Sequence, residues 1–520
     1  MSDEKNVAER FGLPLLSDLI HRNLVRDRRT LIPYALAKQR KILPVEETDS
    51  ELIVAVSNPA DLEAIEELRL LLRRPLTLAM ACPAAIEQAI ERCYRQHEGE
   101  AQKLLVGLES EKMTDSDALD GYDLLEGKEE NPIIRMLNAI FLEAIQQGAS
   151  DIHFEPGEEG TVIRYRIDGV LHKRHAPPKS LEAQISTRVK VMAKMDIAEH
   201  RLPQDGRIKL NQGGKEIDFR VSTLPTVHGE RIVLRILDKG NVLLGLDQIG
   251  INEPLLKGLR KLIHLPEGIV LVTGPTGSGK TTTLYSALSE INAAEMNILT
   301  IEDPVEYKLK GISQMNVNPR IELDFAKGLR HILRQDPDVI MIGEIRDRQT
   351  AEIAIQASLT GHLVFSTLHT NDAPSALTRL ADMGIEPYLL ASSILGVLAQ
   401  RLVRRICPDC KTVYVPTREE LSELGLKSEG LKGAKFHRGI GCEKCFSSGY
   451  RGRCALYELM PVTSKIKAQV LKSQDSEELR KVALSQGMIS LFNAGIQLVL
   501  SGITTSSEVL RVTKVAEGSG

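Results

Sequence analysis

The sequence lacks several features that would place it in other classes of protein. No apolar run reaches the ~18 residues of a membrane-spanning helix, because the nearest candidate, residues 388–403, is interrupted by polar side chains. The 66 basic and 70 acidic residues nearly cancel, so no overall positive charge draws the chain to nucleic acid or anionic lipid. No basic stretch is interleaved with aromatic residues, which argues against a nucleic-acid translocase.

The first residues, MSDEKNVAER, also lack the positively charged and apolar segments of a secretory signal. We therefore expect a cytoplasmic protein whose membrane contacts run through partners or its surface. The hydrophobic share of 42% and the charged share of 26% are typical of a folded, soluble chain. At 520 residues the chain is too long for one hydrophobic core, so several domains are expected.

Changes of pattern along the chain suggest where the domains lie. We expect a small α/β module, an acidic flexible linker, an α+β domain, a core of alternating strands and helices, a cysteine-rich domain and a helical C-terminal region. In chain order these cover residues 1–96, 97–130, 131–240, 241–403, 404–455 and 456–520.

The α+β domain has clear local signals. Asn131 and Pro132 are typical of a helix start, and Gly148 is typical of its end. Residues 162–167 then alternate in polarity, and Asp168 and Gly169 form a turn signal, which together predict a β-hairpin.

Four short apolar runs follow, at residues 269–273, 298–301, 339–342 and 363–368. Runs that are apolar on both faces and alternate with helical segments are typical of a parallel sheet covered on both sides. The sequence therefore predicts a doubly wound α/β core.

The first of these runs leads into a phosphate-binding loop. Residues 274–281 read GPTGSGKT, which fits the pattern GxxxxGK[ST], and a helical segment follows as the pattern requires. Glycines let backbone amides converge on phosphates, Lys280 supplies a charge to the β- and γ-phosphates, and the Thr281 hydroxyl ligates magnesium. A chance glycine-rich loop would not have both flanks right.

Acidic residues follow the next two runs. Glu302 and Asp303 come directly after residues 298–301, and Glu344 follows residues 339–342 after one glycine. Ligands of doubly wound sheets lie at the carboxyl ends of the strands, so these acids could hold magnesium and its water and orient the attacking water. They could instead be helix caps or solvent-facing loop acids.

The last run carries a histidine at each end, His362 and His369. An extended segment of this length holds them about 23 Å apart, so both cannot touch one phosphate. We predict a functional role for His369, at the carboxyl end. His362 is then a capping residue or a contact to a neighbouring subunit.

Two CxxC pairs, Cys407 with Cys410 and Cys442 with Cys445, have the layout of a tetrathiolate zinc site. A redox pair or unrelated buried thiols are the alternatives. Four thiolates would leave no open coordination position, so a structural zinc is expected. The role of Cys454 is open.

Four motifs in series carry a family resemblance. In order, GPTGSGKT, TIEDPVE, RQDPDVIMIGEIRD and TGHLVFSTLHTN resemble the Walker A, Asp box, Walker B and His box of the secretion ATPase superfamily. RLPQDGR precedes them, as in the type II secretion and type IV pilus assembly branches, and GVLAQRLVRRICPDC looks closer to the type II branch. With the cysteine pairs, the resemblance covers the chain from about residue 130 to the end.

The resemblance implies a RecA-like P-loop core with a parallel sheet, preceded by an α+β, PAS-like domain and a small N-terminal α/β module, with an inserted zinc-binding domain. It implies a homo-hexameric ring that uses ATP, Mg²⁺ and Zn²⁺ and is peripherally associated with the inner membrane. Its expected partners are the cytoplasmic domain of a bitopic inner-membrane type II secretion protein and a polytopic inner-membrane platform protein, with acidic phospholipid as a further candidate. In some relatives a related N-terminal module binds cyclic di-GMP, but their signature is not evident near residues 11–13, and we do not predict that ligand.

The resemblance also assigns residues. Arginines matching Arg220 and Arg235 reach the phosphates from the neighbouring subunit, although surface strand arginines are the alternative. The expected catalytic set is Lys280, Glu302, Glu344, His369, Arg220 and Arg235. The expected nucleotide-binding set is Gly274, Pro275, Thr276, Gly277, Ser278, Gly279, Lys280, Thr281, Thr282, Asp303, Arg330, Arg334, Arg346 and His362.

These observations favour a hexameric ATPase that drives type II protein secretion. A pilus extension or DNA-uptake ATPase shares the same chemistry and differs here only by resemblance. A nucleotide-regulated binding module without turnover is disfavoured by the two acids at strand ends.

Overall fold

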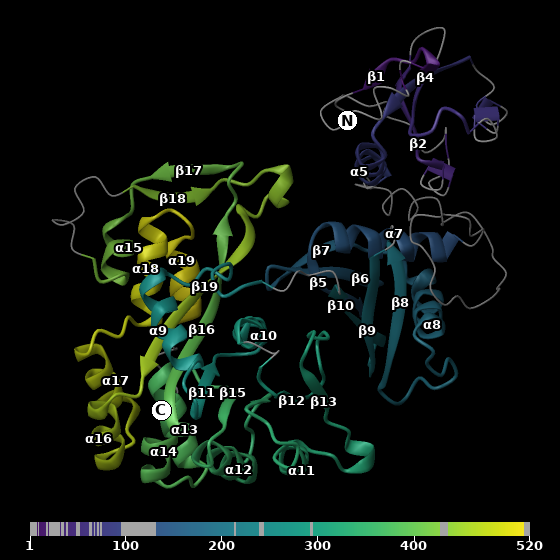
Figure 1. Cartoon of the computed structure of the whole chain (residues 1–520). Coiled ribbons are helices and arrows are strands. Elements are labelled where there is room, and N and C mark those ends of the chain that lie inside the picture. Colours follow the sequence, from purple (N-terminus) through teal and green to yellow (C-terminus); the bar gives the residue numbers. More distant parts are fainter. Residues whose placement is uncertain are drawn as a thin grey trace. The chain divides into compact units, whose positions relative to one another are not determined.

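The computed structural model describes residues 132–513 except 213–214, 239–243, 292–294 and 427–434, together with parts of residues 8–94. The linker expected at 97–130 and the cap expected at Asn131 lie outside the described residues. The chain forms two compact units, Met1–Asn241 and Val242–Gly520 (Figure 1).

The first unit begins with a four-stranded sheet of order β1-β4-β3-β2. Only β2 runs antiparallel to its neighbour. The elements are β1 (Leu15–Leu16), β2 (Ile42–Glu47), β3 (Leu52–Val56), β4 (Leu76–Ala81) and α5 (Pro83–Tyr94). Ile86, Ala89 and Ile90 form one apolar stripe on α5 and share a core with Val54 of β3.

A six-stranded antiparallel sheet of order β7-β6-β5-β10-β9-β8 follows in the same unit. Its elements are α7 (Pro132–Gln146), β5 (Ala149–Pro156), β6 (Thr161–Ile167), β7 (Val170–His175), η2 (Lys179–Leu181), α8 (Glu182–Met192), β8 (Gln204–Gln212), β9 (Lys215–Thr226) and β10 (Gly229–Asp238). The predicted hairpin is confirmed, because Asp168 and Gly169, with φ of 49° and 85°, join β6 to β7. Ile152, Tyr165 and Phe219 pack against Phe141 of α7 in one core.

The second unit is built on a seven-stranded sheet of order β13-β12-β14-β15-β11-β16-β19. The first six strands are parallel and β19 is antiparallel. They are β11 (Gly268–Thr273), β12 (Ile298–Glu302), β13 (Ser313–Asn316), β14 (Val339–Ile342), β15 (Leu363–Leu368), β16 (Ile394–Ile406) and β19 (Tyr450–Pro461). The four apolar runs of the sequence are therefore neighbouring strands, as predicted.

Helices cover both faces of this sheet. Val270 and Val272 of β11 share a core with α9 and α10, whereas Ile269 and Leu271 face a second core with α11, α12 and α13. This alternation explains why the central strands β11 and β14 are apolar at almost every position. The helices are α9 (Glu253–Ile263), α10 (Lys280–Glu290), η3 (Pro319–Ile321), α11 (Phe325–Ile332), α12 (Arg348–Leu359), α13 (Ala373–Asp382) and α14 (Pro387–Ser393).

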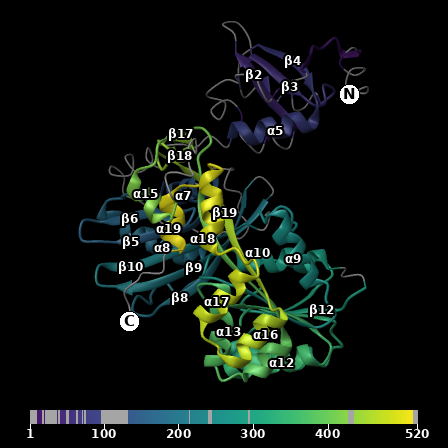
Figure 2. The ribbon, with the colours of Figure 1, turned by 90° about the vertical axis from the view of Figure 1, so that its left-hand side faces the viewer.

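Strands β16 and β19 are long and continue past the core toward a small two-stranded sheet (Figure 1). The elements there are β17 (Lys411–Tyr414), α15 (Arg418–Glu423), β18 (Phe436–Gly439) and η5 (Glu443–Cys445). The C-terminal helices are α16 (Ser464–Lys472), α17 (Ser476–Ser485), α18 (Leu491–Leu500) and α19 (Ser506–Thr513). Helices α18 and α19 lie along β16 and β19, whereas α16 packs against α14 and α17 packs against α13 (Figure 2). Strand β19 crosses the boundary expected at residues 455 and 456, because it closes the core sheet against β16.

Within the described residues, no helix combines the length and the apolar character needed to cross a membrane. Residues 388–403, the longest apolar stretch of the sequence, are divided between α14 and β16.

Candidate nucleotide site

Four adjacent strands of the second unit end at one edge of the sheet, in the order β12, β14, β15 and β11, and β16 runs past this edge beside β11. Thr273 at the end of β11 pairs with Leu368 of β15 and with Ala399 of β16. Ile342 at the end of β14 pairs with Ile301 of β12. Because this register aligns the strand ends, the residues that follow them gather along one edge.

The phosphate loop leaves β11 at this edge and enters α10. Gly274 and Gly279 have φ of 148° and 90°, which only glycine adopts readily. A Cβ on Gly274 would lie 2.4 Å from the Gln400 carbonyl oxygen, and one on Gly279 would lie 2.8 Å from the Gln400 side-chain nitrogen. Two glycines of the motif are therefore required by the close approach of β16.

Lys280 is the first residue of α10, and its Nζ donates to the carbonyl oxygens of Gly274 at 2.7 Å and Pro275 at 3.1 Å. Burial lowers the pKa of the Lys280 ammonium to about 8, with Glu344 opposing this shift and Arg401 adding to it. The lysine and Glu344 are therefore within electrostatic reach of each other. Thr281 and Thr282 follow on the exposed first turn of α10.

Glu344 stands two residues beyond β14 and is bonded by two basic side chains. One carboxylate oxygen binds the Arg346 guanidinium, and the other lies 3.2 Å from His369 Nε2. Burial opposes ionisation, but Arg346 and His369 outweigh it and hold the pKa of Glu344 below its ordinary value. An ionised carboxylate at this edge can orient a water molecule or accept its proton.

Glu302 is buried and its carboxylate is already committed to neighbours. It accepts from the Tyr285 hydroxyl, from Thr300 Oγ1 at 2.6 Å and from Gln314 Nε2 at 3.1 Å. Asp303, the next residue, is exposed and acts electrostatically on Arg346. Of the two acids after β12, the exposed one is therefore the more available to a metal or its water.

Three predicted nucleotide-binding residues are not brought to the Lys280 and Glu344 pair by any hydrogen bond or ion pair of the described residues. His362 lies at the other end of β15 from His369, where its Nδ1 contacts the Ala357 carbonyl oxygen at 2.8 Å as a cap of α12. Arg330 and Arg334 lie exposed near the end of α11, and Arg334 contacts His331 at 2.6 Å.

The two arginines of the first unit are cross-strand neighbours. Arg220 of β9 pairs directly with Arg235 of β10 and, on its other side, with Arg207 of β8. Residues directly opposite in a sheet share a face, so the three form a row. Arg235 Nε donates to Asp151 at 3.0 Å, which fixes one end of that row.

Sequence reasoning did not identify two residues beside the phosphate loop, Gln400 and Arg401 of β16. Gln400 Oε1 accepts from Thr283 Oγ1 of α10 at 2.7 Å. Both lie in the segment GVLAQRLVRRICPDC, but nothing in that segment points to the phosphate loop, because their place follows only from the pairing of β16 with β11. The polar pair inside an otherwise apolar segment is the one signal that could have found them.

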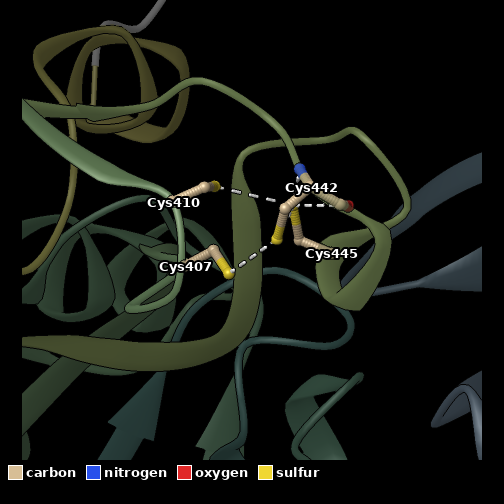
Figure 3. A group of neighbouring side chains, drawn as sticks. All are labelled: Cys407, Cys410, Cys442 and Cys445. Carbon is tan, nitrogen blue, oxygen red and sulfur yellow. Dashed lines mark hydrogen bonds between the residues drawn. The ribbon is translucent and has the colours of Figure 1, made fainter.

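The four predicted cysteines converge at the far end of β16 and β19 (Figure 3). Their sulfur atoms all lie within 4.8 Å of one another. The Sγ distances are 3.8 Å for Cys407 to Cys442 and 3.8 Å for Cys410 to Cys445. A tetrahedral tetrathiolate site with metal–sulfur bonds of about 2.3 Å requires about 3.8 Å between sulfurs.

Backbone amides complete this cluster. The N–H groups of Cys442 and Gly449 donate to Cys445 Sγ at 3.2 and 3.3 Å. Burial opposes ionisation of Cys445, but these donors hold its pKa below the ordinary value. The four cysteines can therefore hold a metal ion, and no disulfide joins them.

Known proteins resemble this chain over most of its length. The family model described as type II/IV secretion system protein matches residues 126–511, and the MshEN domain model matches residues 11–100. Type II secretion system protein E of Dickeya dadantii is 48% identical over 94% of this chain and 97% of its own length. Type II secretion system ATPase E of Vibrio cholerae is 46% identical over 93% of this chain and 96% of its own.

A pilus protein and a solved structure are also similar. The type IV pilus assembly ATPase PilB of Myxococcus xanthus is 42% identical over 97% of this chain and 89% of its own length. The structure of the Legionella pneumophila ATPase DotB, with 20% identity and a TM-score of 0.54, covers 76% of this chain and 97% of its own, and shares the fold. With a P-loop ATPase fold and a family match over most of its length, this chain belongs to the type II/IV secretion system protein family.

Proposed function

We propose that this chain is the ATP-hydrolysing motor of type II protein secretion, in which turnover drives pseudopilus assembly and the export of folded proteins across the outer membrane. The observation that supports this most is the shared edge of β12, β14, β15 and β11, where Lys280 and Glu344 lie within electrostatic reach. A lysine that binds phosphate and a carboxylate that handles water are the two parts that hydrolysis needs. The relatives named above make type II secretion the favoured setting.

Each residue of the edge has a proposed part. The amides of residues 274–280 and the Lys280 ammonium bind the β- and γ-phosphates of ATP. Thr281 and Asp303 hold Mg²⁺ or its water, and the metal when bound neutralises charge on the phosphates. Glu344, kept ionised by Arg346 and His369, orients the attacking water and accepts its proton.

Glu302 is buried at the end of β12, where its carboxylate joins α10 to β12 through Tyr285 and Thr300. We therefore propose for Glu302 a positioning part, in which it fixes the strand end that carries Asp303. Arg330, Arg334 and His362, which lie away from the pair, are proposed to act on the nucleotide only across a subunit boundary.

The arginine row of the first unit suggests how subunits complete the site. In a homo-hexameric ring, Arg220 and Arg235 of one subunit would reach the phosphates held by its neighbour, where guanidinium groups suit bidentate contact. Their adjacent places in one sheet support a joint action. Arg207 shares their row and extends the basic surface.

For the cysteine cluster we propose a structural Zn²⁺. Four thiolates at tetrahedral spacing leave no open position for substrate or water. The ion would join the loop after β16 to the loop before β19 and so fix the outer ends of these two strands relative to each other.

The proposed place of the protein is the cytoplasmic side of the inner membrane. The N-terminal module, which matches the MshEN domain, would dock on the cytoplasmic domain of a bitopic membrane protein of the secretion system. The ring would act on a polytopic platform protein, and acidic phospholipid is a further proposed contact. Nucleic acid is not a proposed partner.

Phosphate release by the purified full-length protein tests the proposal. We expect Mg²⁺-dependent ATP turnover that Lys280→Ala abolishes, that single-stranded DNA leaves unchanged, and that the cytoplasmic fragment of a type II secretion membrane partner stimulates. Stimulation by the matching fragment of a pilus system instead would favour a pilus motor. A Lys280→Ala variant that turns over ATP at the parental rate contradicts the proposed site.

A further inference from the structure

Arg401 of β16 lies beside the phosphate loop and has no part in the roles assigned above. One of its terminal nitrogens donates to the Asn371 carbonyl oxygen at 3.1 Å and to the Asn371 side-chain oxygen at 2.8 Å. Among the described residues no group accepts from its buried Nε. Partial burial of this guanidinium lowers its pKa and costs free energy.

Asn371 belongs to the short loop between β15 and α13 that begins at His369. The two sides of this loop are held by different strands. Thr370 Oγ1 lies 2.7 Å from Thr273 Oγ1 at the end of β11, and Arg401 of β16 holds Asn371. Asp372 then begins α13, where it accepts from Ser375 N–H and from Arg480 at 2.6 Å.

His369 itself is half-exposed, with 48% of its side chain accessible, so packing alone does not fix its position. Its contact with Glu344 depends on where the loop backbone lies. Two residues away, Arg401 donates one hydrogen bond to that backbone, at the Asn371 carbonyl oxygen, and a second to the Asn371 side chain. A displacement of about 1 Å at a reacting group can cost about a hundredfold in rate, so a small movement of the loop matters.

We propose that Arg401 is a positioning residue for ATP hydrolysis, which holds the loop after β15 so that His369 meets Glu344. This inference rests on the proposed function of the site. The Arg401 charge also acts electrostatically on Lys280, and Asp372 and Glu458 act electrostatically on Arg401. Arg401 therefore connects the His369 loop to the strand that backs the phosphate loop.

A double-mutant cycle on the full-length protein tests this. Arg401→Gln should lower kcat about tenfold while the KM for ATP changes less than about threefold, because the residue acts on the catalytic pair and not on ground-state binding. In a His369→Ala background the same substitution should cause no further loss, since the group that it positions is gone. Arg401→Lys should recover part of the rate.

Arg405→Gln is the matched control, because Arg405 is an exposed arginine of the same strand and its loss changes the charge equally. It should keep kcat within about twofold of the parent. If Arg401→Gln fails to fold, Asn371→Ala tests the same contact, because it removes the hydrogen bond between Arg401 and the Asn371 side chain. Its smaller loss should also vanish in the His369→Ala background.

The inference is overturned if the losses from Arg401→Gln and His369→Ala multiply, or if Arg401→Gln behaves like Arg405→Gln. It is also overturned if His369→Ala keeps full turnover, since no pair would then need positioning. Failure of the proposed function looks different, because the parent protein and Lys280→Ala would then release phosphate at the same rate.

Discussion

The phosphate-loop edge and the cysteine cluster belong to the same unit but are built in opposite ways. The four cysteines come from two short loops, and their sulfur atoms form a closed group within 4.8 Å. The nucleotide edge takes residues from five strands and the loops that follow them, from Thr273 at the end of β11 to Arg401 of β16, and it is open to solvent at His369 and Arg346. The closed site can be predicted from the spacing of its cysteines in the sequence. The open site depends on the order of the strands in the sheet.

This difference decides what a substitution should do. Removing a ligand from a closed site destabilises the surrounding loops, because nothing else can replace the ligand. Removing a group from the open edge should change chemistry and leave the fold intact, because the strands beneath are held by their own core.

The largest expected effect is on turnover. Glu344→Gln should bind ATP with near-parental affinity but hydrolyse it about a hundredfold to a thousandfold more slowly, because the amide cannot accept a proton. Nucleotide binding and phosphate release measured on one preparation check this. Glu352→Gln, on the exposed face of α12, is the matched control and should be neutral. Parental turnover in Glu344→Gln would remove this residue from the catalytic role.

Next in size is the cysteine cluster. Cys442→Ser should lose bound zinc and lower the stability of the region around β17 and β18 by several kcal/mol, on the order expected for a structural metal ligand. Metal analysis together with limited proteolysis of the region measures this. Cys454→Ser, which alters a half-buried thiol outside the cluster, serves as the control. Untagged protein that contains no zinc and is unchanged by Cys442→Ser contradicts the site.

The open nucleotide edge should also differ from the closed cysteine cluster in the pH dependence of ligand binding. Because the pKa of Lys280 is lowered to about 8, its ammonium is lost above that pH, and ATP affinity should fall by up to about tenfold per pH unit there. Below about pH 7 the affinity should be flat. Titration with a fluorescent ATP analogue between about pH 6.5 and 9.5 measures how the affinity depends on pH. This range spans that pKa by about 1.5 units on each side.

Unfolding of the protein cannot explain a fall in ATP affinity at high pH that comes from Lys280. A lysine whose pKa falls from 10.5 to about 8 on folding releases its proton from the native state first, so its contribution to stability improves as pH rises between these values. Lys280→Arg keeps its charge throughout and should give a flat profile. An affinity of the parent protein that stays constant to pH 9.5 would contradict the lowered pKa.

The smallest expected effect concerns a helix cap beside the edge. Asp347 accepts from the Thr350 N–H at 2.8 Å and begins α12 three residues after Glu344. Asp347→Ala should lower the free energy of unfolding by about 1 kcal/mol with little change in turnover. Chemical denaturation checks the first part and phosphate release the second. A hundredfold loss of turnover would show that Asp347 belongs to the chemistry.

Much of this architecture could be predicted from local patterns. The apolar runs are parallel strands, Asp168 and Gly169 turn the hairpin, and the CxxC spacing brings four thiols together. Each of these depends on residues that are neighbours in sequence or on a strand buried on both faces.

The rest depended on pairing between distant segments. Residues 394–406 gave no strand signal that distinguished them from a helix, so the approach of Gln400 to Gly274 and Gly279 was not predicted. Glu302 showed the same limit, since only the fold reveals that Tyr285 and Gln314 already bind its carboxylate. The proposed catalytic roles of Arg220 and Arg235 stay predictions, because they concern a neighbouring subunit.

Whether Lys280 and Glu344 meet one magnesium-bound triphosphate is best tested by a structure of the assembled protein with Mg²⁺ and a non-hydrolysable ATP analogue. We expect the terminal phosphate within hydrogen-bond reach, about 3 Å, of Lys280 Nζ. We also expect a single water molecule between the Glu344 carboxylate and the phosphorus. A terminal phosphate bound to Lys280 with no Glu344 carboxylate near it, from the same subunit or from its neighbour, would contradict it.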